Sequence, residues 1–467
     1  MSTPTIAHEL AAFAADARRS LPDAVSADVV GRITDVIGNS LAALEARGPA
    51  EPHNALLRLM RRRGGSEEAG VVGGGRRLPA SAAALVNGTL AHALDFDDTH
   101  LPSVLHPSAS VVPAALAVAE AEGRTGAELL AAVAVGNEIC NRLGMASYIP
   151  ELRNSTFFEK GLHATSICGT VGAAASTAML LGLDEAGISS AMGIAASMGA
   201  GIIEANRTGG TVKHVHCGWA AHAAVEAGLF AAEGVTGPPT VFEGRFGFLR
   251  AHLGDDHDAS AVTEGLGDRW ELLRTVYKPY PSNHFTHPAI DCALALRAEG
   301  LDPEHIESIE LGVAAAPLRT IGEPRAEKIR PRSAYHAKFS GPYTVAAALH
   351  GGGGLGVHLD DFTEEALADP ARRALTEKVT VVADPVCDDE FPNAFSAVLR
   401  VRTTDGRTLE HRRHSSRGGP EFPLTAGELA LKFELNAGRV LTPAEATAVR
   451  DRIRALPGAP RVESLTG

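Results

Sequence analysis

The chain has 467 residues, which is long for a single ordinary core, so two or three domains with a sizeable buried interior are expected. Its composition, 45% hydrophobic and 21% charged, is typical of a soluble globular protein, and no run approaches the roughly 18 apolar residues of a membrane span. A net charge of −13 argues against a nucleic-acid surface, which needs clustered lysine and arginine. Without a signal-peptide pattern, we expect a cytoplasmic protein that contacts neither membrane nor nucleic acid.

The five cysteines are far apart and include no CxxC pair. This spacing is unlike an iron–sulfur or structural zinc site, so we expect buried free thiols.

The pattern of apolar residues changes along the chain and predicts the fold class. From about residue 5 to 265, alanine-rich segments such as "TGAELLAAVAVGNEICNRLG" repeat at helical spacing and end in glycine, which predicts an all-helical domain over 1–270. The segments "HIESIELGVAA", "KVTVVADP" and "FSAVLRVRTTDGRTLEHRRHS" show β-branched alternation and a hairpin turn, so residues 271–405 are predicted to form a smaller α+β domain. Residues 406–467 are helical again and are expected to rejoin the first domain.

A polar cluster interrupts the helical region at "VNGTLAHALDFDDTHLPSVLHPSAS". We place residues 86–106 on a helix that ends at Pro102. One side of this helix would be apolar, and the other would carry His92, Asp95 and Thr99. Asp97 and Asp98 would lie nearer the apolar side, so at least one should be buried and hydrogen-bonded. For any one of these residues, a helix cap or a satisfied core polar group is the alternative.

Four further segments place polar side chains beside apolar helices. His163 precedes a helix whose positive end would suit a carboxylate, although a lone histidine there is more often structural. Lys213 precedes a strongly apolar helix, so it should pair with an anion or reach solvent. Prolines flank Lys278, and Asn283 and His284 follow closely. Tyr343 precedes another apolar helix, where it could also be core filler.

Taken in order, six segments resemble the MmgE/PrpD family, which includes 2-methylcitrate dehydratase, cis-aconitate decarboxylase and iminodisuccinate epimerase. They are "NGTLAHALDFDDT", "HPSASVVPAALA", "GLHATSICGTVGAA", "VKHVHCGWAA", "KPYPSNHFTHPAID" and "AKFSGPYTVA". The resemblance implies a large helical domain with a smaller α+β lid, a homodimer, and an active site between the domains. The site residues that it implies are Asp95, Thr99, His106, His163, Lys213, Lys278 and Tyr343. One position departs, because Asn283, followed by His284, stands where the decarboxylase branch has a histidine.

The chemistry shared by this family is reaction at a carbon next to a carboxylate. The enediolate-like intermediate needs fixed positive charge and a base poised near neutral pH. We expect Lys213 and Lys278 to supply the charge, and His106 or His163 to act as base or acid. Five further residues are expected to orient the substrate or a catalytic histidine: Asp95, Thr99, Tyr343 and, as substrate-binding residues, the pair Asn283 and His284. Asp95 would set the tautomer of a histidine.

The resulting hypothesis is a lyase that needs no cofactor and no metal and acts on a small polycarboxylate. A hydro-lyase resembling 2-methylcitrate dehydratase is placed first, with a decarboxylase of a cis-aconitate-like acid or an epimerase of an iminodisuccinate-like acid as alternatives. Two other classes stay open. One is a metal-dependent hydrolase with His92, Asp95, Asp97 or Asp98, and His106 as ligands, and the other is a non-catalytic helical scaffold.

Overall fold

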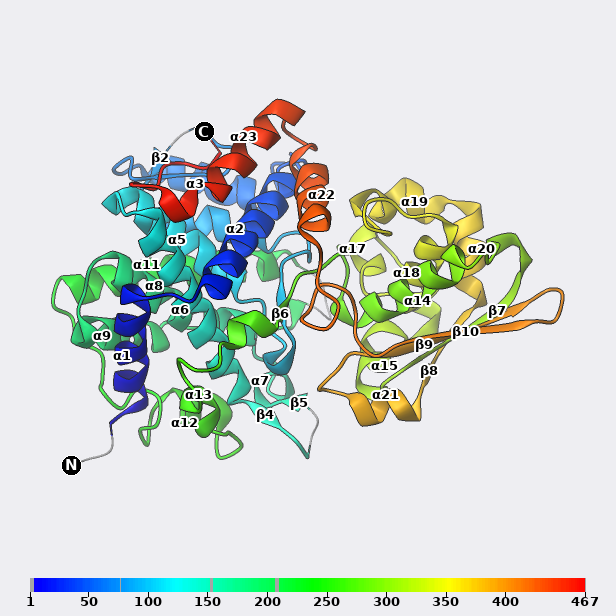
Figure 1. The fold of residues 1–467 in the computed structure, drawn as a ribbon, viewed down its shortest axis with the longest axis horizontal. Coiled ribbons are helices and arrows are strands. Elements are labelled where there is room, and N and C mark those ends of the chain that lie inside the picture. The colour runs from blue at the N-terminus through cyan, green and yellow to red at the C-terminus, as the bar shows by residue number, and fades with distance from the viewer. Residues whose placement is uncertain (1–3, 76, 152–153, 206–209, 467) are drawn as a thin grey trace. The chain divides into compact units, whose positions relative to one another are not determined.

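The computed structural model describes residues 4–75, 77–151, 154–205 and 210–466, and the chain divides into two compact units (Figure 1). Unit 1 comprises Met1–Thr275 and Phe433–Gly467, and unit 2 comprises Val276–Lys432. Helices dominate unit 1, and the main sheet belongs to unit 2, so the predicted mainly helical fold with a smaller α+β part is confirmed.

Unit 1 is built from helices joined by short strands. Its α-helices are α1 (Ile6–Arg19), α2 (Asp23–Ala43), α3 (Pro52–Arg63), α4 (Ala80–Ala91), α5 (Ser108–Glu122), α6 (Gly126–Met145), α7 (Thr156–Glu159), α8 (Ala164–Leu180), α9 (Glu185–Ala196), α11 (Val212–Ala232), α12 (Phe248–Leu253), α13 (Ser260–Thr263) and α23 (Pro443–Arg454). Its strands and 3-10 turns are β1 (Ala69–Gly70), β2 (Arg77–Leu78), β3 (Thr99–His100), β4 (Tyr148–Ile149), β5 (Asn154–Ser155), η1 (Leu101–Ser103), η2 (Glu271–Arg274) and η6 (Leu456–Gly458). Strand β6 (Thr275–Val276) and helix α22 (Ala426–Ala437) lie at the divisions between the units.

Helix α8 is the centre of unit 1. Every one of its residues is buried, and it packs against α5, α6, α9 and α11. Small residues allow the close approach that the alanine-rich sequence predicts. Where α11 crosses α4, a Cβ on Gly218 would lie 2.3 Å from the carbonyl oxygen of Leu85, so the two backbones touch directly. This crossing brings the end of α4 close to the start of α11.

Unit 2 contains a four-stranded sheet in the order β10, β9, β7, β8. Strands β7 (Ile306–Val313) and β8 (Val379–Ala383) are parallel, whereas β9 (Ala397–Thr403) pairs antiparallel with both β7 and β10 (Thr408–Arg413). Helix α14 (His287–Ala298) packs on β9 and β10, and α18 (Gly341–His350) packs on β8. The remaining elements are α15 (Ala315–Ile321), α16 (Arg325–Lys328), α17 (Ala334–Ala337), α19 (Glu364–Ala368), α20 (Pro370–Lys378), α21 (Pro385–Glu390), η3 (His284–Thr286), η4 (Pro303–His305) and η5 (Leu359–Phe362).

The second division between the units differs from the sequence-based boundary at residue 405. That boundary falls inside the β9–β10 hairpin, in which Arg402 pairs with Thr408, so β10 stays with the sheet and unit 2 continues to Lys432. A hairpin turn is a local signal, whereas the place where the chain returns to another core depends on distant contacts.

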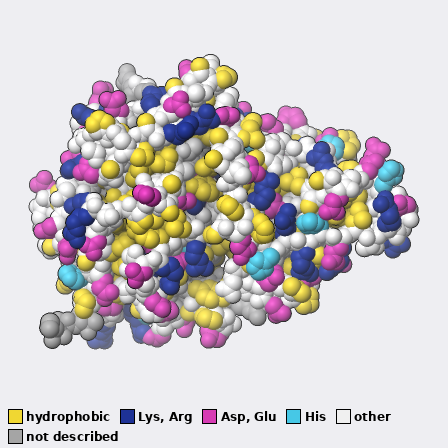
Figure 2. Space-filling view, viewed as in Figure 1, with side chains coloured by type: hydrophobic (Ala, Val, Ile, Leu, Met, Phe, Trp, Pro, Cys, Tyr) yellow, Lys and Arg dark blue, Asp and Glu magenta, His cyan; other side chains and the backbone are white. Residues whose placement is uncertain are grey.

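Two general expectations can be compared with the described residues. All five cysteines are buried free thiols, as predicted. Among the described helices, none is long and apolar enough to cross a membrane. On the face in Figure 2, acidic and basic side chains are interspersed, with no single broad basic area.

Candidate active site

The polar segment after α4 is a loop, so the prediction of one helix from residue 86 to Pro102 is wrong. Helix α4 ends at Ala91, and His92 is its C-terminal cap. Asp95 has a φ of 56°, in the left-handed region that a continuing right-handed helix excludes. Helical periodicity was misleading here because Asp97 turns back to His92 at the end of α4, and Asp98 pairs with Arg32 on α2.

The first of these contacts is a buried ion pair between His92 and Asp97. His92 Nδ1 lies 2.7 Å from Asp97 Oδ2, and neither side chain is exposed. Burial alone would lower the pKa of His92, but the neighbouring Cys217 and the Asp97 carboxylate outweigh it and raise the pKa to about 10. His92 is therefore an imidazolium at neutral pH.

The second contact holds Asp98 in the core. Its Oδ2 accepts a hydrogen bond of 2.6 Å from Ser108 Oγ and lies 3.3 Å from the Arg32 guanidinium. Burial raises the pKa of Asp98 to about 6, against the opposing effect of Arg32. The expectation that at least one of Asp97 and Asp98 is buried and hydrogen-bonded is confirmed for both.

Asp98 also orients His106, through its backbone. His106 Nδ1 lies 2.6 Å from the Asp98 carbonyl oxygen, which can only accept, so Nδ1 carries the proton. The neutral ring then has its lone pair on Nε2. Thr99 Oγ1 is 3.4 Å from the same Nδ1, and the His106 side chain is 16% exposed. His106 thus combines a defined tautomer with partial access to solvent.

His163 precedes α8, as predicted, and pairs with a second histidine. Its Nδ1 lies 2.9 Å from Nδ1 of His216 on α11. Burial and then the positive charges of His92 and Lys213 lower the pKa of His163 well below its usual value. Burial, His92 and Lys213 also lower the pKa of His216 to about 4. Both rings are therefore neutral at pH 7.

Lys213, in the first turn of α11, faces an acidic residue. Its Nζ lies 3.8 Å from Asp95 Oδ1, and the two side chains are 12% and 6% exposed. The expected pairing of Lys213 with an anion is confirmed. The expected role of Asp95 in setting a histidine tautomer stays a prediction.

These groups converge on one cluster in unit 1. The ring centroid of His92 lies 5.4 Å from that of His106 and 5.7 Å from that of His163. The rings of His163 and His216 are 4.9 Å apart. We call the four rings the imidazole cluster. It brings together a fixed cation, neutral imidazoles and the amino group of Lys213.

The other predicted residues belong to unit 2. Lys278 is buried, and the Asn283 side chain accepts a hydrogen bond of 3.1 Å from the Phe285 amide, where it caps η3. The roles of these residues in catalysis stay predictions.

Two further predicted residues, His284 and Tyr343, form hydrogen bonds within unit 2. His284 Nε2 is 3.1 Å from Ser416 Oγ. The Tyr343 hydroxyl donates to the Asp361 carbonyl oxygen, and burial raises the pKa of this phenol. The parts of His284 and Tyr343 in the reaction likewise stay predictions.

Two members of the cluster were missed as acid–base residues. The sequence suggests His92 for a polar helix face or a metal site, and the spacing of His214 and His216 after Lys213 could equally indicate a metal site. The sequence carries a weak signal for each, because His92 and Asp97 are close in sequence and His216 lies one turn after Lys213 on α11. Neither signal distinguishes a site from a satisfied core.

The ligands suggested for a metal-dependent hydrolase have other partners. Asp95 faces Lys213, Asp97 binds His92, and Asp98 binds Ser108 and Arg32. Within the described ranges, no group of three or more histidine, cysteine, aspartate or glutamate side chains is arranged to hold a metal ion.

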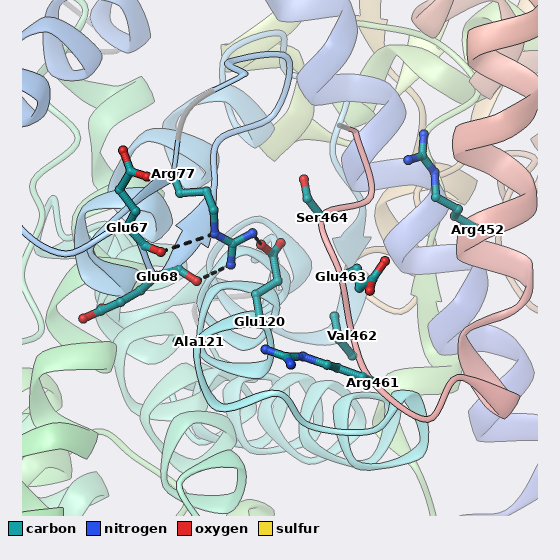
Figure 3. A pocket seen from close by; sticks show the side chains of 10 residues that line it. All are labelled: Glu67, Glu68, Arg77, Glu120, Ala121, Arg452, Arg461, Val462, Glu463 and Ser464. Carbon is teal, nitrogen blue, oxygen red and sulfur yellow. Dashed lines mark hydrogen bonds and ion pairs between the residues drawn. The ribbon is translucent and has the colours of Figure 1, made fainter.

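A separate surface cavity of about 670 Å³ in unit 1 contains none of the predicted site residues (Figure 3). Arg77 lies at its wall, 3.2 Å from Glu120 and hydrogen-bonded to the carbonyls of Glu67 and Glu68. Residues of the C-terminal segment, including Arg461 and Ser464, line the opposite side. The ion pair of Arg77 joins the β1–β2 hairpin to α5, and its two hydrogen bonds lie within the hairpin segment.

The fold is that of a mainly helical protein with a cluster of four histidines in its helical unit and a second, α+β unit. Comparison with known protein families identifies two matching domains. Residues 8–260 match the MmgE/PrpD N-terminal domain, and residues 280–456 match the MmgE/PrpD C-terminal domain. The chain belongs to the MmgE/PrpD family.

Several proteins similar to this chain are named cis-aconitate decarboxylase. Cis-aconitate decarboxylase of Homo sapiens is 31% identical over 379 residues, which cover 78% of this chain and 74% of the relative. The Mus musculus enzyme of the same name is 30% identical, with coverage of 78% and 73%. Cis-aconitate decarboxylase of Aspergillus terreus is 27% identical over 394 residues, with coverage of 80% and 78%.

Proposed function

We propose that this protein is a lyase that acts at a carbon next to a carboxylate in a small polycarboxylate. The observation that carries the proposal is the imidazole cluster, in which a buried imidazolium, His92, lies beside His106 and the neutral His163. Such a site can move a proton without a redox cofactor or a metal. The family and the similarity to enzymes named cis-aconitate decarboxylase support a polycarboxylate as substrate.

Each group has a role in this proposal. His106 accepts or donates a proton through Nε2, because its Nδ1 proton is held by the Asp98 carbonyl. Lys213 stabilises the negative charge that develops on the substrate carboxylate, and the start of α8 adds the positive end of its dipole. Asp95 keeps the Lys213 amino group in place until a substrate carboxylate competes for it.

Among the possible reactions, we place decarboxylation of a cis-aconitate-like acid first. In that reaction the bond between carbon and one carboxylate breaks, carbon dioxide leaves, and a proton is delivered to the resulting carbanion. The similarity to decarboxylases supports this choice over the hydro-lyase that the sequence alone favoured.

The hydro-lyase remains the second candidate, for one specific reason. Asn283 stands at the position where the decarboxylase branch has a histidine, and its carboxamide caps η3. A carboxamide does not donate a proton as an acid. The proton for a decarboxylation would therefore have to come from the imidazole cluster. If it does not, loss of water or epimerisation would be the reaction.

The test is incubation with cis-aconitate, citrate, 2-methylcitrate and an iminodisuccinate analogue in deuterated water, followed by NMR. Release of carbon dioxide with deuterium in the product supports the decarboxylase, and loss of water supports the hydro-lyase. Exchange of deuterium without net loss would indicate an epimerase. His106→Asn should abolish turnover, whereas the control His305→Asn, at an exposed histidine of unit 2, should not. Absence of reaction with every compound would contradict the proposal.

We also propose a homodimer, as the family resemblance implies, and a cytoplasmic location. Large apolar side chains on α11 are exposed, with Trp219 at 47% and Phe230 at 40%, and exposed apolar side chains favour association. Sedimentation velocity measures the state directly, and a monomer at micromolar concentration would contradict the dimer.

A further inference from the structure

His163 and His216 form a hydrogen-bonded pair whose members differ in exposure. Nδ1 of His163 and Nδ1 of His216 are 2.9 Å apart, a normal hydrogen-bond length for two nitrogens. His163 is buried, at 4% exposure, whereas His216 is half-buried on α11. Ser166 Oγ donates to the His216 carbonyl oxygen and ties α8 to α11 at this point.

The charge around His163 restricts how it can work. His92 and Lys213 are cations, and a third positive charge on a buried ring beside them is costly. His163 is therefore a poor simple base, because accepting a proton would make it an imidazolium. The ring can take part in proton transfer only if it releases one proton as it gains another.

We propose that His216 is the second member of a proton relay, through which His163 exchanges protons with solvent while remaining neutral. This inference rests on the proposed function, because it needs a proton at the substrate carbon. When a neutral His163 carries its proton on Nδ1, that proton is donated to the Nδ1 lone pair of His216, and His216 carries its own proton on Nε2.

The transfer balances in each direction. In the outward direction, Nε2 of His163 takes the proton from carbon, the Nδ1 proton of His163 passes to Nδ1 of His216, and the Nε2 proton of His216 passes to water. In the inward direction, water gives a proton to Nε2 of His216, the Nδ1 proton of His216 passes back to Nδ1 of His163, and Nε2 of His163 delivers its proton to the carbanion. Each ring exchanges its tautomer and keeps zero charge. After the product leaves, water occupies the site. Protons then move through the two rings in the opposite direction, which restores the starting tautomers.

The test uses His216→Phe and His216→Gln, which remove the relay nitrogen. We expect kcat to fall by roughly 100-fold, as for loss of a general acid or base, with little change in KM. Added imidazole should recover part of kcat in the variants and have no effect on the natural protein. A structural role would not produce rescue by a buffer. The matched control is His222→Phe, since His222 is another half-buried histidine of α11 whose Nδ1 contacts the Ser81 carbonyl.

A second measurement covers the case in which the variants do not fold. Nitrogen-15 NMR of histidine-labelled natural protein should show two neutral rings joined by one Nδ1 proton. A cationic ring in the pair, or an unchanged kcat in a folded variant, would overturn the relay, and so would a lowered kcat that imidazole does not recover. Natural protein that turns over no compound of the panel would instead remove the proposed function, and the relay with it.

Discussion

The buried ion pair of His92 and Asp97 predicts an unusual dependence of stability on pH. Folded His92 keeps its proton up to a pKa of about 10, whereas the unfolded chain releases it above the ordinary value of 6.5. Between these values the folded state binds more protons than the unfolded state. The free energy of unfolding of unit 1 should therefore fall as the pH rises, and the contribution of His92 should be fully present only below pH 6.5.

The size of this effect follows from the difference between the two pKa values. One pKa unit corresponds to about 1.4 kcal/mol, so His92 alone would lower the free energy of unfolding by up to about 4 kcal/mol between pH 6.5 and pH 9.5. In His92→Asn this part of the slope should be absent.

The chain is suited to this measurement. Its two tryptophans, Trp219 and Trp270, both belong to unit 1, so fluorescence during urea unfolding reports on unit 1. The control is His305→Asn, at a histidine whose side chain is 68% exposed. Equal slopes for the natural protein and His92→Asn would refute the reasoning, because they would mean that His92 is not held as a cation.

Three further substitutions test the supports of the site. Arg32→Met should lower the free energy of unfolding by about 3 to 5 kcal/mol, because it leaves the carboxylate of Asp98 buried without its cation, as thermal unfolding would show. Gly218→Ala should cost about 1 to 3 kcal/mol and also lower kcat, because the new methyl group meets the Leu85 carbonyl and pushes α11 from α4. Lys213→Met should reduce kcat/KM by roughly 100-fold to 1,000-fold, through loss of the charge that stabilises the substrate carboxylate.

Matched controls distinguish these effects from general damage. Arg402→Met breaks an exposed ion pair with Glu307 and should cost less than about 1 kcal/mol. Gly427→Ala adds a methyl group on an exposed turn of α22, where its nearest neighbour is 3.9 Å away, and should be neutral or stabilising. Lys213→Arg keeps the charge and should retain more activity than Lys213→Met. Similar losses within each pair would contradict the assignment concerned.

Local patterns along the chain were enough to predict much of this protein. Alanine-rich runs at helical spacing predicted the helices of unit 1, and β-branched alternation predicted strands β7, β8 and β9. The ordered motifs identified the family and pointed to His106, His163 and Lys213, because each lies at the start of a helix that the sequence already marks.

Other features depended on tertiary structure. The loop after α4 has its shape because Asp97 turns back to His92 and Asp98 pairs with the distant Arg32, and a helical projection takes no account of such partners. The partnership of His163 and His216 joins residues 53 positions apart, through the packing of α8 against α11. Composition and periodicity determine which segments are helical. Which ring is charged, and which nitrogen holds a proton, depends on burial and on neighbours that only the folded chain brings together.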